Sequence, residues 1–413
     1  MKILVIGLSP YLVTSRSKLS ALIMRSLYLK GFQVAGAVWS HDTNYFPPEI
    51  NEKSGPDGPE SVTLHVYKFE LPNFGQHWIP IIPFERGEKE VFSIYEIIKS
   101  AEPDVVITVG DYGDFLYMKA VKTFCNFKWL FVLMNYSSPI QEQDEDLIND
   151  TDGVLCTSNF AFESIQDFYK KDNLLVKYVG GNCESYRLLE NKKSDKFRIM
   201  SIGKPIQADN LPVVMEAASI LHGEHQDIEL YLHASLYDKG DYDLESLRNR
   251  FDPQSKFIVF PKKYVSLTEE VTDSELSYEM DISDIFVSVP MVSATSVGVF
   301  DALSCGCFPL LSNQGSHSDV SRLLGDSIEG YKTEDFAVPC VNLIAAGGYN
   351  LGICDPQVLS EKMLWAYRNR KKIEGSRGNL SQFITKCKRT DFLESLHAMV
   401  DRTLKSDNSL YLE

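Results

Sequence analysis

The stretch that decides the fold is SATSVGVFDALSCG, at residues 293–306, and it lies between two apolar segments. The segment before it, IFVSVP at residues 285–290, and the segment after it, FPLLS at residues 308–312, each have the length and composition of a buried strand. A turn of small residues and a short helix would join these strands, which is the order found in a parallel sheet. Because the first N–H groups of a helix are free and its dipole is positive there, the stretch predicts an anion-binding turn.

The turn supplies the groups of this predicted site. The backbone N–H groups near Thr295, Ser296 and Val297, with the hydroxyls of Thr295 and Ser296, are expected to contact phosphate. Asp301 follows about two helical turns further on, on the same side of the predicted helix. A phosphate site with a hydroxyl-binding acid beside it suits a nucleotide-sugar.

Strands and helices alternate along the rest of the chain. In the first half, strand patterns occur at residues 2–7, 32–39, 62–69, 105–109, 129–134 and 154–157. Residues 40–60 contain four prolines and two glycines without periodicity, and are predicted to be a loop. The pattern restarts near residue 195, with strands at residues 198–202, 229–233, 257–260, 285–289 and 309–311.

This alternation predicts the fold class. A length of 413 residues suits two domains, and alternating elements form a mostly parallel sheet with helices on both faces. We therefore expect an α/β protein of two doubly wound Rossmann-like domains that face a central cleft. The expected domains are residues 1–194 and 195–385, followed by a helix within residues 386–413 that crosses back to the first domain.

Composition excludes some classes of function. The net charge of −16 argues against a general nucleic-acid binder, and no apolar window of about 18 residues predicts a membrane span. Residues 361–405 carry 11 basic and 5 acidic side chains, so this basic face is either a solvated helix surface or a contact with phosphate or an anionic membrane. The eight cysteines and eight histidines lack zinc-site spacing, so we expect no metal and reduced thiols in the cytoplasm.

Residues 293–312 resemble the nucleotide-binding segment of the retaining nucleotide-sugar glycosyltransferases of the GT-B fold, in the large group 1 family (family 4-like). Their segment reads roughly acid-Gly-Thr-Ser-Val-Ser-Leu-Leu-Glu-Ala-Met-Ala-x-Gly-x-x-Pro-Val-Val-Ser. The sequence RIMSIGK at residues 198–204 is similar to the opening of that family's second domain. VGGN at residues 179–182, and GYNL at residues 348–351 with Asp355, resemble two further motifs.

The resemblance implies a hexosyltransferase-type enzyme that moves a sugar from a UDP- or GDP-linked donor to a hydroxyl acceptor, with retention and without a metal. The acceptor would be a glycan or a lipid-linked hydroxyl, which implies peripheral contact with the inner face of the membrane. Lys204 and the turn amides would stabilise the diphosphate, and Asp301 would accept from the ribose hydroxyls. Gly203 and Ser293 belong to the same predicted nucleotide-sugar contacts.

The sequence also departs from the family pattern. Ser293 stands where the family has an acid, and Asp301 stands where it has a glutamate. Lys204 occupies the usual arginine position, and Asp209 occupies that of a lysine. Either the donor site is rebuilt, or catalysis is weakened or lost.

In the first domain, polar residues follow three predicted strands, at the edge where open α/β sheets bind ligands. Ser9 is a further predicted donor contact. Tyr11, Asp111, Tyr112 and Asn135 are the predicted acceptor contacts, and Asp111 joins Lys204 and Asp301 as a predicted catalytic residue; its alternative role is to cap a loop. Two other functions stay open: a DNA-base glycosyltransferase of phage type, and a non-catalytic binding or assembly protein that keeps the GT-B fold.

Overall fold

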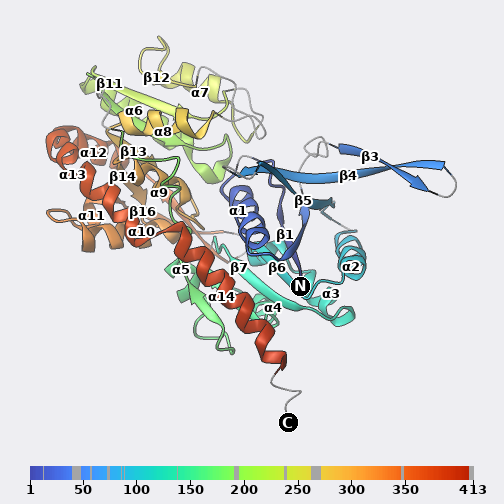
Figure 1. Cartoon of the computed structure of the whole chain (residues 1–413). Helices are drawn as coiled ribbons and strands as arrows, with labels where there is room; N and C mark the ends of the chain where they lie inside the picture. The colour runs from blue at the N-terminus through green and yellow to red at the C-terminus, as the bar shows by residue number, and fades with distance from the viewer. Residues whose placement is uncertain are drawn as a thin grey trace.

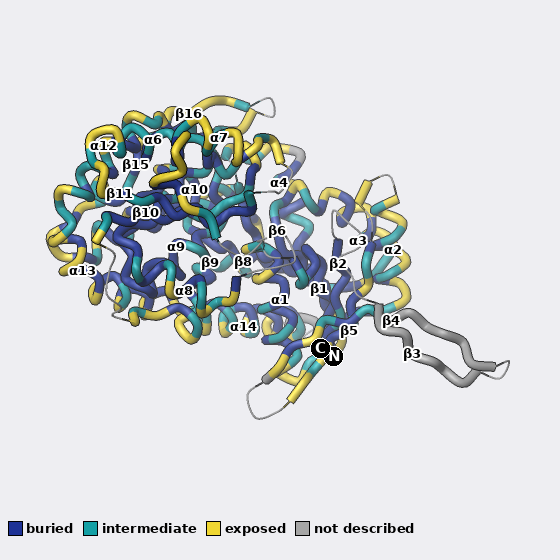
Figure 2. Tube along the Cα trace, turned by 90° about the horizontal axis from the view of Figure 1, so that it is seen from above, coloured by how far each residue is buried: buried dark blue, intermediate teal, exposed yellow. Residues whose placement is uncertain are grey.

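The computed structural model shows two α/β domains, each built on its own sheet (Figure 1). The structure describes residues 1–12, 14–39, 48–55, 58–71, 75–84, 86–87, 89–136, 138–189, 195–236, 240–261, 271–345 and 348–408. Figure 2 shows the buried residues gathered along the strands of both sheets and the exposed residues on the outer helices. The fold is the predicted one, with two Rossmann-like domains.

The first sheet has nine strands in the order β3-β4-β5-β2-β1-β6-β7-β8-β9. Strand β1 pairs in parallel with both β2 and β6, so the strand order reverses beside it and leaves a crevice at its carboxyl end. The strands are β1 (Lys2–Leu8), β2 (Gln33–Trp39), β3 (Pro48–Gly55), β4 (Gly58–Leu71), β5 (Gly75–Pro83), β6 (Val105–Gly110), β7 (Lys128–Leu133), β8 (Gly153–Cys156) and β9 (Leu174–Val176). Five helices accompany them among the described residues: α1 (Ser15–Leu29), α2 (Glu90–Ala101), α3 (Met118–Phe124), α4 (Glu142–Asn149) and α5 (Asn159–Glu163).

The prediction of a loop over residues 40–60 was wrong for its second part. Strands β3 and β4 form an antiparallel hairpin at the edge of the first sheet. An edge strand tolerates proline at its first residue, because the missing N–H there is not needed for the ladder, and Pro48 holds that position. Residues 40–47 lie outside the described ranges.

The second sheet is parallel throughout, in the order β12-β11-β10-β13-β14-β15. Its order reverses between β10 and β13, which again opens a crevice at the carboxyl ends. The strands are β10 (Phe197–Ile202), β11 (Ile228–His233), β12 (Ile258–Val259), β13 (Ile285–Ser288), β14 (Phe308–Ser312) and β15 (Ala337–Val338). The helices are α6 (Leu211–Glu224), α7 (Leu244–Phe251), α8 (Asp273–Ile282), α9 (Val297–Ser304), α10 (Gly315–Ser327), α11 (Thr333–Phe336), α12 (Pro356–Arg368) and α13 (Arg370–Phe383). A separate hairpin pairs β16 (Cys340–Ile344) with β17 (Asn350–Cys354).

The last helix, α14 (Arg389–Asn408), returns to the first domain, where Figure 1 shows it running along β7. Its buried residues Phe392, Leu396 and Met399 share one apolar cluster with Ile3 and Val5 of β1. The chain thus crosses between the domains twice. The predicted boundary at residue 194 lies outside the described residues, and both boundaries stay predictions.

Candidate functional site

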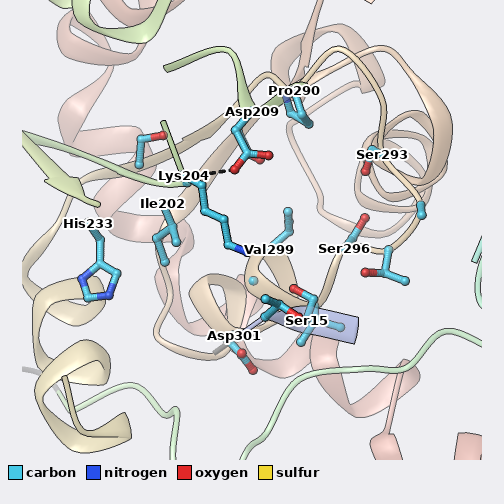
Figure 3. A pocket seen from close by; sticks show the side chains of 18 of the residues that line it. Ser15, Ile202, Lys204, Asp209, His233, Pro290, Ser293, Ser296, Val299 and Asp301 are labelled. Carbon is cyan, nitrogen blue, oxygen red and sulfur yellow. Dashed lines mark hydrogen bonds between the residues drawn. The ribbon is translucent and has the colours of Figure 1, made fainter. Parts of the chain in front are cut away.

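A cleft of about 510 Å³ lies between the two domains, at the carboxyl ends of their strands (Figure 3). The first domain contributes the start of α1 and residues after β7. The second contributes residues after β10, β11 and β13, together with the start of α9. Both topological switch points therefore open into one space, which is where doubly wound sheets bind ligands.

Helix α9 begins at Val297, so Asp301 lies one turn into it and not two as predicted. Ser296 is the N-cap residue, and no side chain caps the helix. Among the described residues, the N–H groups of Val297 and Gly298 have no acceptor. These amides and the positive end of the helix dipole are available to an anion in the cleft.

A cluster of three serines fixes the shape of this turn. The Oγ atoms of Ser293 and Ser296 lie 2.8 and 3.0 Å from Ser316 Oγ, and the Ser316 N–H donates to the carbonyl oxygen of Ser293 (2.9 Å). Gly315, at φ +51°, allows the start of α10 to lie this close to Ser293, because a Cβ on residue 315 would lie 2.1 Å from the Ser293 carbonyl oxygen. The hydroxyls of Ser293 and Ser296 thus hold the turn, while Thr295 beside them is half-buried and lines the cleft.

Lys204 follows β10, and its side chain runs into the cleft toward Val299 (Figure 3). Its backbone N–H donates to Asp209 Oδ2 (2.7 Å). Burial raises the pKa of the Asp209 carboxyl, while the N–H and the ammonium of Lys204 lower it. A Cβ on Gly203 would lie 2.8 Å from Leu211 Cδ2, so a larger residue there would displace that side chain. A carboxylate therefore stands beside the predicted phosphate-binding cation.

The start of α1 also faces the cleft, a contribution that the sequence did not predict. Thr14 caps this helix by accepting from the Ser17 N–H (3.1 Å), and Thr14 and Ser15 line the cleft. Arg16 and Lys18 line it too. Arg16 is ion-paired with Asp114 of the same domain. The signal in the sequence was a capping threonine soon after the first strand, but only the docked domains show that this helix end meets α9 across one cleft.

The structure does not bring five predicted first-domain residues to the cleft. Asp111 caps a 3₁₀ turn: its Oδ1 accepts from the Gly113 N–H and its Oδ2 from the Tyr136 N–H, both at 3.1 Å. Tyr11 donates its hydroxyl to the Val66 carbonyl oxygen. Ser9, Tyr112 and Asn135 are buried in the domain. Met134 and Tyr136, the two neighbours of Asn135, line the cleft.

Charged side chains of both signs line the cleft. Burial lowers the pKa values of His233 and His317 in its walls to about 4, so both imidazoles are neutral at neutral pH. Among the described lining residues, the cations are Arg16, Lys18 and Lys204 and the carboxylates are Asp209 and Asp301. Because Arg16 and Lys18 are ion-paired with Asp114 and Asp273, an anionic ligand would depend mainly on Lys204 and on the amides at the start of α9.

Asp301 lines the floor of the cleft but is not free of the protein. Its Oδ1 accepts from the Asn182 N–H (2.8 Å) and lies 4.0 Å from the Arg389 guanidinium. Burial raises the pKa of this carboxyl to about 6, although Arg389 and the Asn182 N–H act in the opposite direction. Among the described residues, only its Oδ2 is left to meet a ligand.

Comparison with known proteins gives matches in structure alone. No protein-family model and no curated protein sequence matches the chain. Sucrose-phosphate synthase from Thermosynechococcus elongatus superposes with a TM-score of 0.71 at 10% identity, over 98% of this chain and 100% of that one. A glycosyltransferase from Rickettsia africae has a TM-score of 0.64 at 15% identity, over 98% of each chain. HepE from Anabaena, solved in complex with UDP, has a TM-score of 0.64 at 11% identity, over 97% of this chain and 100% of that one.

At these identities the likeness establishes the fold, which is the GT-B fold of two facing Rossmann-like domains. Within the described ranges, no helix is long and apolar enough to cross a bilayer. The described residues also contain no group of three or more His, Cys, Asp or Glu side chains placed to share a metal ion.

Proposed function

We propose that this chain is a glycosyltransferase that binds a nucleotide-diphosphate sugar in the interdomain cleft and transfers its hexosyl group to a hydroxyl acceptor. One observation carries the proposal: the N-termini of α1 and α9 face one cleft from opposite domains, with Lys204 beside them. Amide groups and helix dipoles at both ends suit a diphosphate, which carries its charge on several oxygens. The UDP bound by HepE, a protein of the same fold, supports this choice of ligand class.

The proposed chemistry needs little from the protein beyond placed positive charge. The bond between the anomeric carbon and the phosphate oxygen breaks, and its electron pair goes to the leaving diphosphate. The amides of Val297 and Gly298 and the Lys204 ammonium would stabilise that growing charge, which is where catalysis gains most. The acceptor oxygen bonds to the anomeric carbon and gives its proton to a phosphate oxygen, on the same face in a retaining reaction, and no metal ion takes part.

The first domain would supply the acceptor side. Tyr136 and the residues at the start of α1 line the cleft opposite α9. We propose a glycan or lipid-linked hydroxyl as acceptor, a UDP- or GDP-linked sugar as donor, and action in the cytoplasm at the inner face of the membrane. Asp111 has no catalytic part in this proposal, because backbone N–H groups occupy both of its carboxylate oxygens.

Calorimetric titration with UDP, GDP, ADP and the matching monophosphates tests the donor site. We expect one diphosphate to bind more tightly than its monophosphate, and at about 100 times its dissociation constant it should add ~2.7 kcal/mol to the free energy of unfolding. Lys204→Gln should weaken binding, whereas the control Lys332→Gln, with a side chain that is 79% exposed, should not. If none of the diphosphates binds, the proposal is wrong.

A nucleotide-binding protein without transferase activity is the second candidate. Asp209 places a carboxylate beside Lys204, and the Ser293 hydroxyl, at the position of an acid in the resembled family, is used to hold the turn. Incubation with UDP-, GDP- and ADP-hexoses, followed by detection of free nucleoside diphosphate, separates the two. Tight binding with no donor turnover, with and without sugar or lipid-phosphate acceptors, would favour the binding protein.

A further inference from the structure

The chain crosses from the first domain to the second near Gly181 and returns near Lys388, and these two crossings pack directly against each other. Gly181 pairs in parallel with Lys388 through an isolated β-bridge. Gly180, at φ +71°, is required there, because a Cβ would lie 2.2 Å from the Cys387 carbonyl oxygen. The crossings therefore form one close-packed junction and not two independent linkers.

Helix α9 packs against both crossings at this junction. A Cβ on Gly181 would lie 2.9 Å from the Phe300 carbonyl oxygen and 2.8 Å from Ser304 Oγ. Asp301 reaches both crossings: its Oδ1 accepts from the Asn182 N–H (2.8 Å) of the first and lies 4.0 Å from the Arg389 guanidinium of the second. The helix that presents its amides to the cleft is thus tied at its middle to both chain crossings.

Charge at this junction centres on one carboxyl group. Arg389 is the strongest of the charges that favour the ionised form of Asp301; Lys18 on α1 acts in the same direction, and Asp273 at the start of α8 acts against it. Cys305, the C-cap residue of α9, is also within electrostatic reach of Asp301. Within the described residues the Arg389 Nε is buried without a hydrogen-bond acceptor, so nothing stronger than the Asp301 carboxylate holds this guanidinium.

We propose that Arg389 is a positioning residue for the donor site: it keeps Asp301 ionised and turned so that Oδ1 stays on the Asn182 amide while Oδ2 accepts from the ribose hydroxyls of a nucleoside diphosphate. The inference rests on the proposed function, because it assigns the nucleoside half of the same donor site. It also gives the junction a role in binding, since a shift of either crossing would move the Asp301 carboxylate and the ribose contact with it.

A pH profile tests the charge relation. Loss of Arg389 removes a group that lowers the pKa of Asp301, so the carboxyl stays protonated to higher pH and accepts less well from a hydroxyl. We expect Arg389→Gln in the full chain to bind UDP, GDP or ADP, whichever the wild type binds most tightly, roughly twofold more weakly at pH 7 and roughly fivefold more weakly at pH 6, with recovery about one pH unit higher than in the wild type. Arg389→Lys should keep most of the affinity. Arg402→Gln, on the exposed side of the same helix, is the matched control.

A second measurement distinguishes loss of the ribose contact from a nonspecific structural effect of the substitution. The wild type should bind the ribonucleotide more tightly than its 2′-deoxy analogue, and Arg389→Gln should reduce that preference, which a purely structural effect would leave intact. Asp301→Asn, a neutral side chain of the same shape, should bind the nucleotide weakly, and its affinity should not change with pH. This variant tests the ribose contact if Arg389→Gln does not fold. A wild type that binds no nucleotide overturns the proposed function. A wild type that binds, with Arg389→Gln matching Arg402→Gln in affinity, pH profile and 2′-preference, overturns this inference alone.

Discussion

Replacement of Gly298 by aspartate should move stability and ligand affinity in opposite directions. Gly298 is the second residue of α9, it lines the cleft, and a Cβ built on it meets no atom within 4 Å. A carboxylate in the first turn of a helix interacts favourably with the dipole by about 0.3–1 kcal/mol, and leaving glycine adds a few tenths. We therefore expect Gly298→Asp to raise the free energy of unfolding by about 0.5–1 kcal/mol.

The same carboxylate would stand where we place the diphosphate. At about 5 Å and an effective dielectric constant of about 20, one added charge repels one phosphate charge by ~3 kcal/mol, a loss on the order of a hundredfold in affinity. The repulsion should shrink as salt is raised, because the site is open to solvent. Calorimetric titration at two ionic strengths measures the affinity, and urea unfolding measures the stability.

Two controls make the result interpretable. Gly298→Ala should gain about 0.5–1 kcal/mol in stability and bind within a few-fold of the wild type, because its methyl group enters open space. Gly298→Asn has the shape of aspartate without the charge, and should lose much less affinity. If Gly298→Asp is folded and binds the diphosphate as tightly as Gly298→Asn, the phosphate does not lie at the start of α9 and the reasoning for the site is refuted.

Three further predictions concern Asp111, Gly315 and Asp301. Asp111→Ala should lower stability by about 1 kcal/mol or more through loss of its cap, while the dissociation constant for the nucleotide stays unchanged. Gly315→Ala should cost at least about 2 kcal/mol in urea unfolding and weaken binding by displacing the turn, whereas Gly375→Ala, which meets no atom within 4 Å, should be neutral or stabilising. Asp301 has a raised pKa of about 6 in the fold, so its contribution to stability is present below its unfolded pKa and is lost as pH rises to about 6. At pH 7.5 the variant Asp301→Asn should therefore be more stable than the wild type by up to about 3 kcal/mol. Urea unfolding at pH 4 should show no such difference between the two proteins.

Local patterns predicted the elements that positioned the site. Residues 285–312 were correctly predicted as strand, small-residue turn, helix and strand, because apolar composition and period are set within a few residues. The hairpin of β3 and β4 was not predicted, since its prolines and glycines have the composition of a loop and only pairing at a sheet edge makes them strands.

The sequence did not predict which way side chains point after a strand ends. Asp111 and Asn135 do follow buried strands, but the Asp111 carboxylate accepts from backbone N–H groups and Asn135 is buried, while Met134 and Tyr136 on either side of Asn135 line the cleft. Arg16 and Lys18 were missed for the converse reason. The alternation of strands and helices predicts a helix between the strands at residues 2–7 and 32–39, yet only the docking of two domains shows that its start faces α9. Such information resides in contacts between distant segments, which no local pattern carries.

The departures from the family pattern change where the binding energy should come from. Ser293 removes a carboxylate and Asp209 replaces a lysine by a carboxylate, so relative to the family pattern the second-domain side of the cleft holds the same number of acids and one cation fewer. The first domain does not fully offset this, because Arg16 is already paired with Asp114. If the proposed function is right, uncharged donors would therefore hold most of the diphosphate, and the candidates are the amides at the starts of α1 and α9. It follows that Gly298→Asp should impair binding more than Lys204→Gln does; the reverse order would mean that the cation, and not the pair of helix ends, is the main phosphate contact.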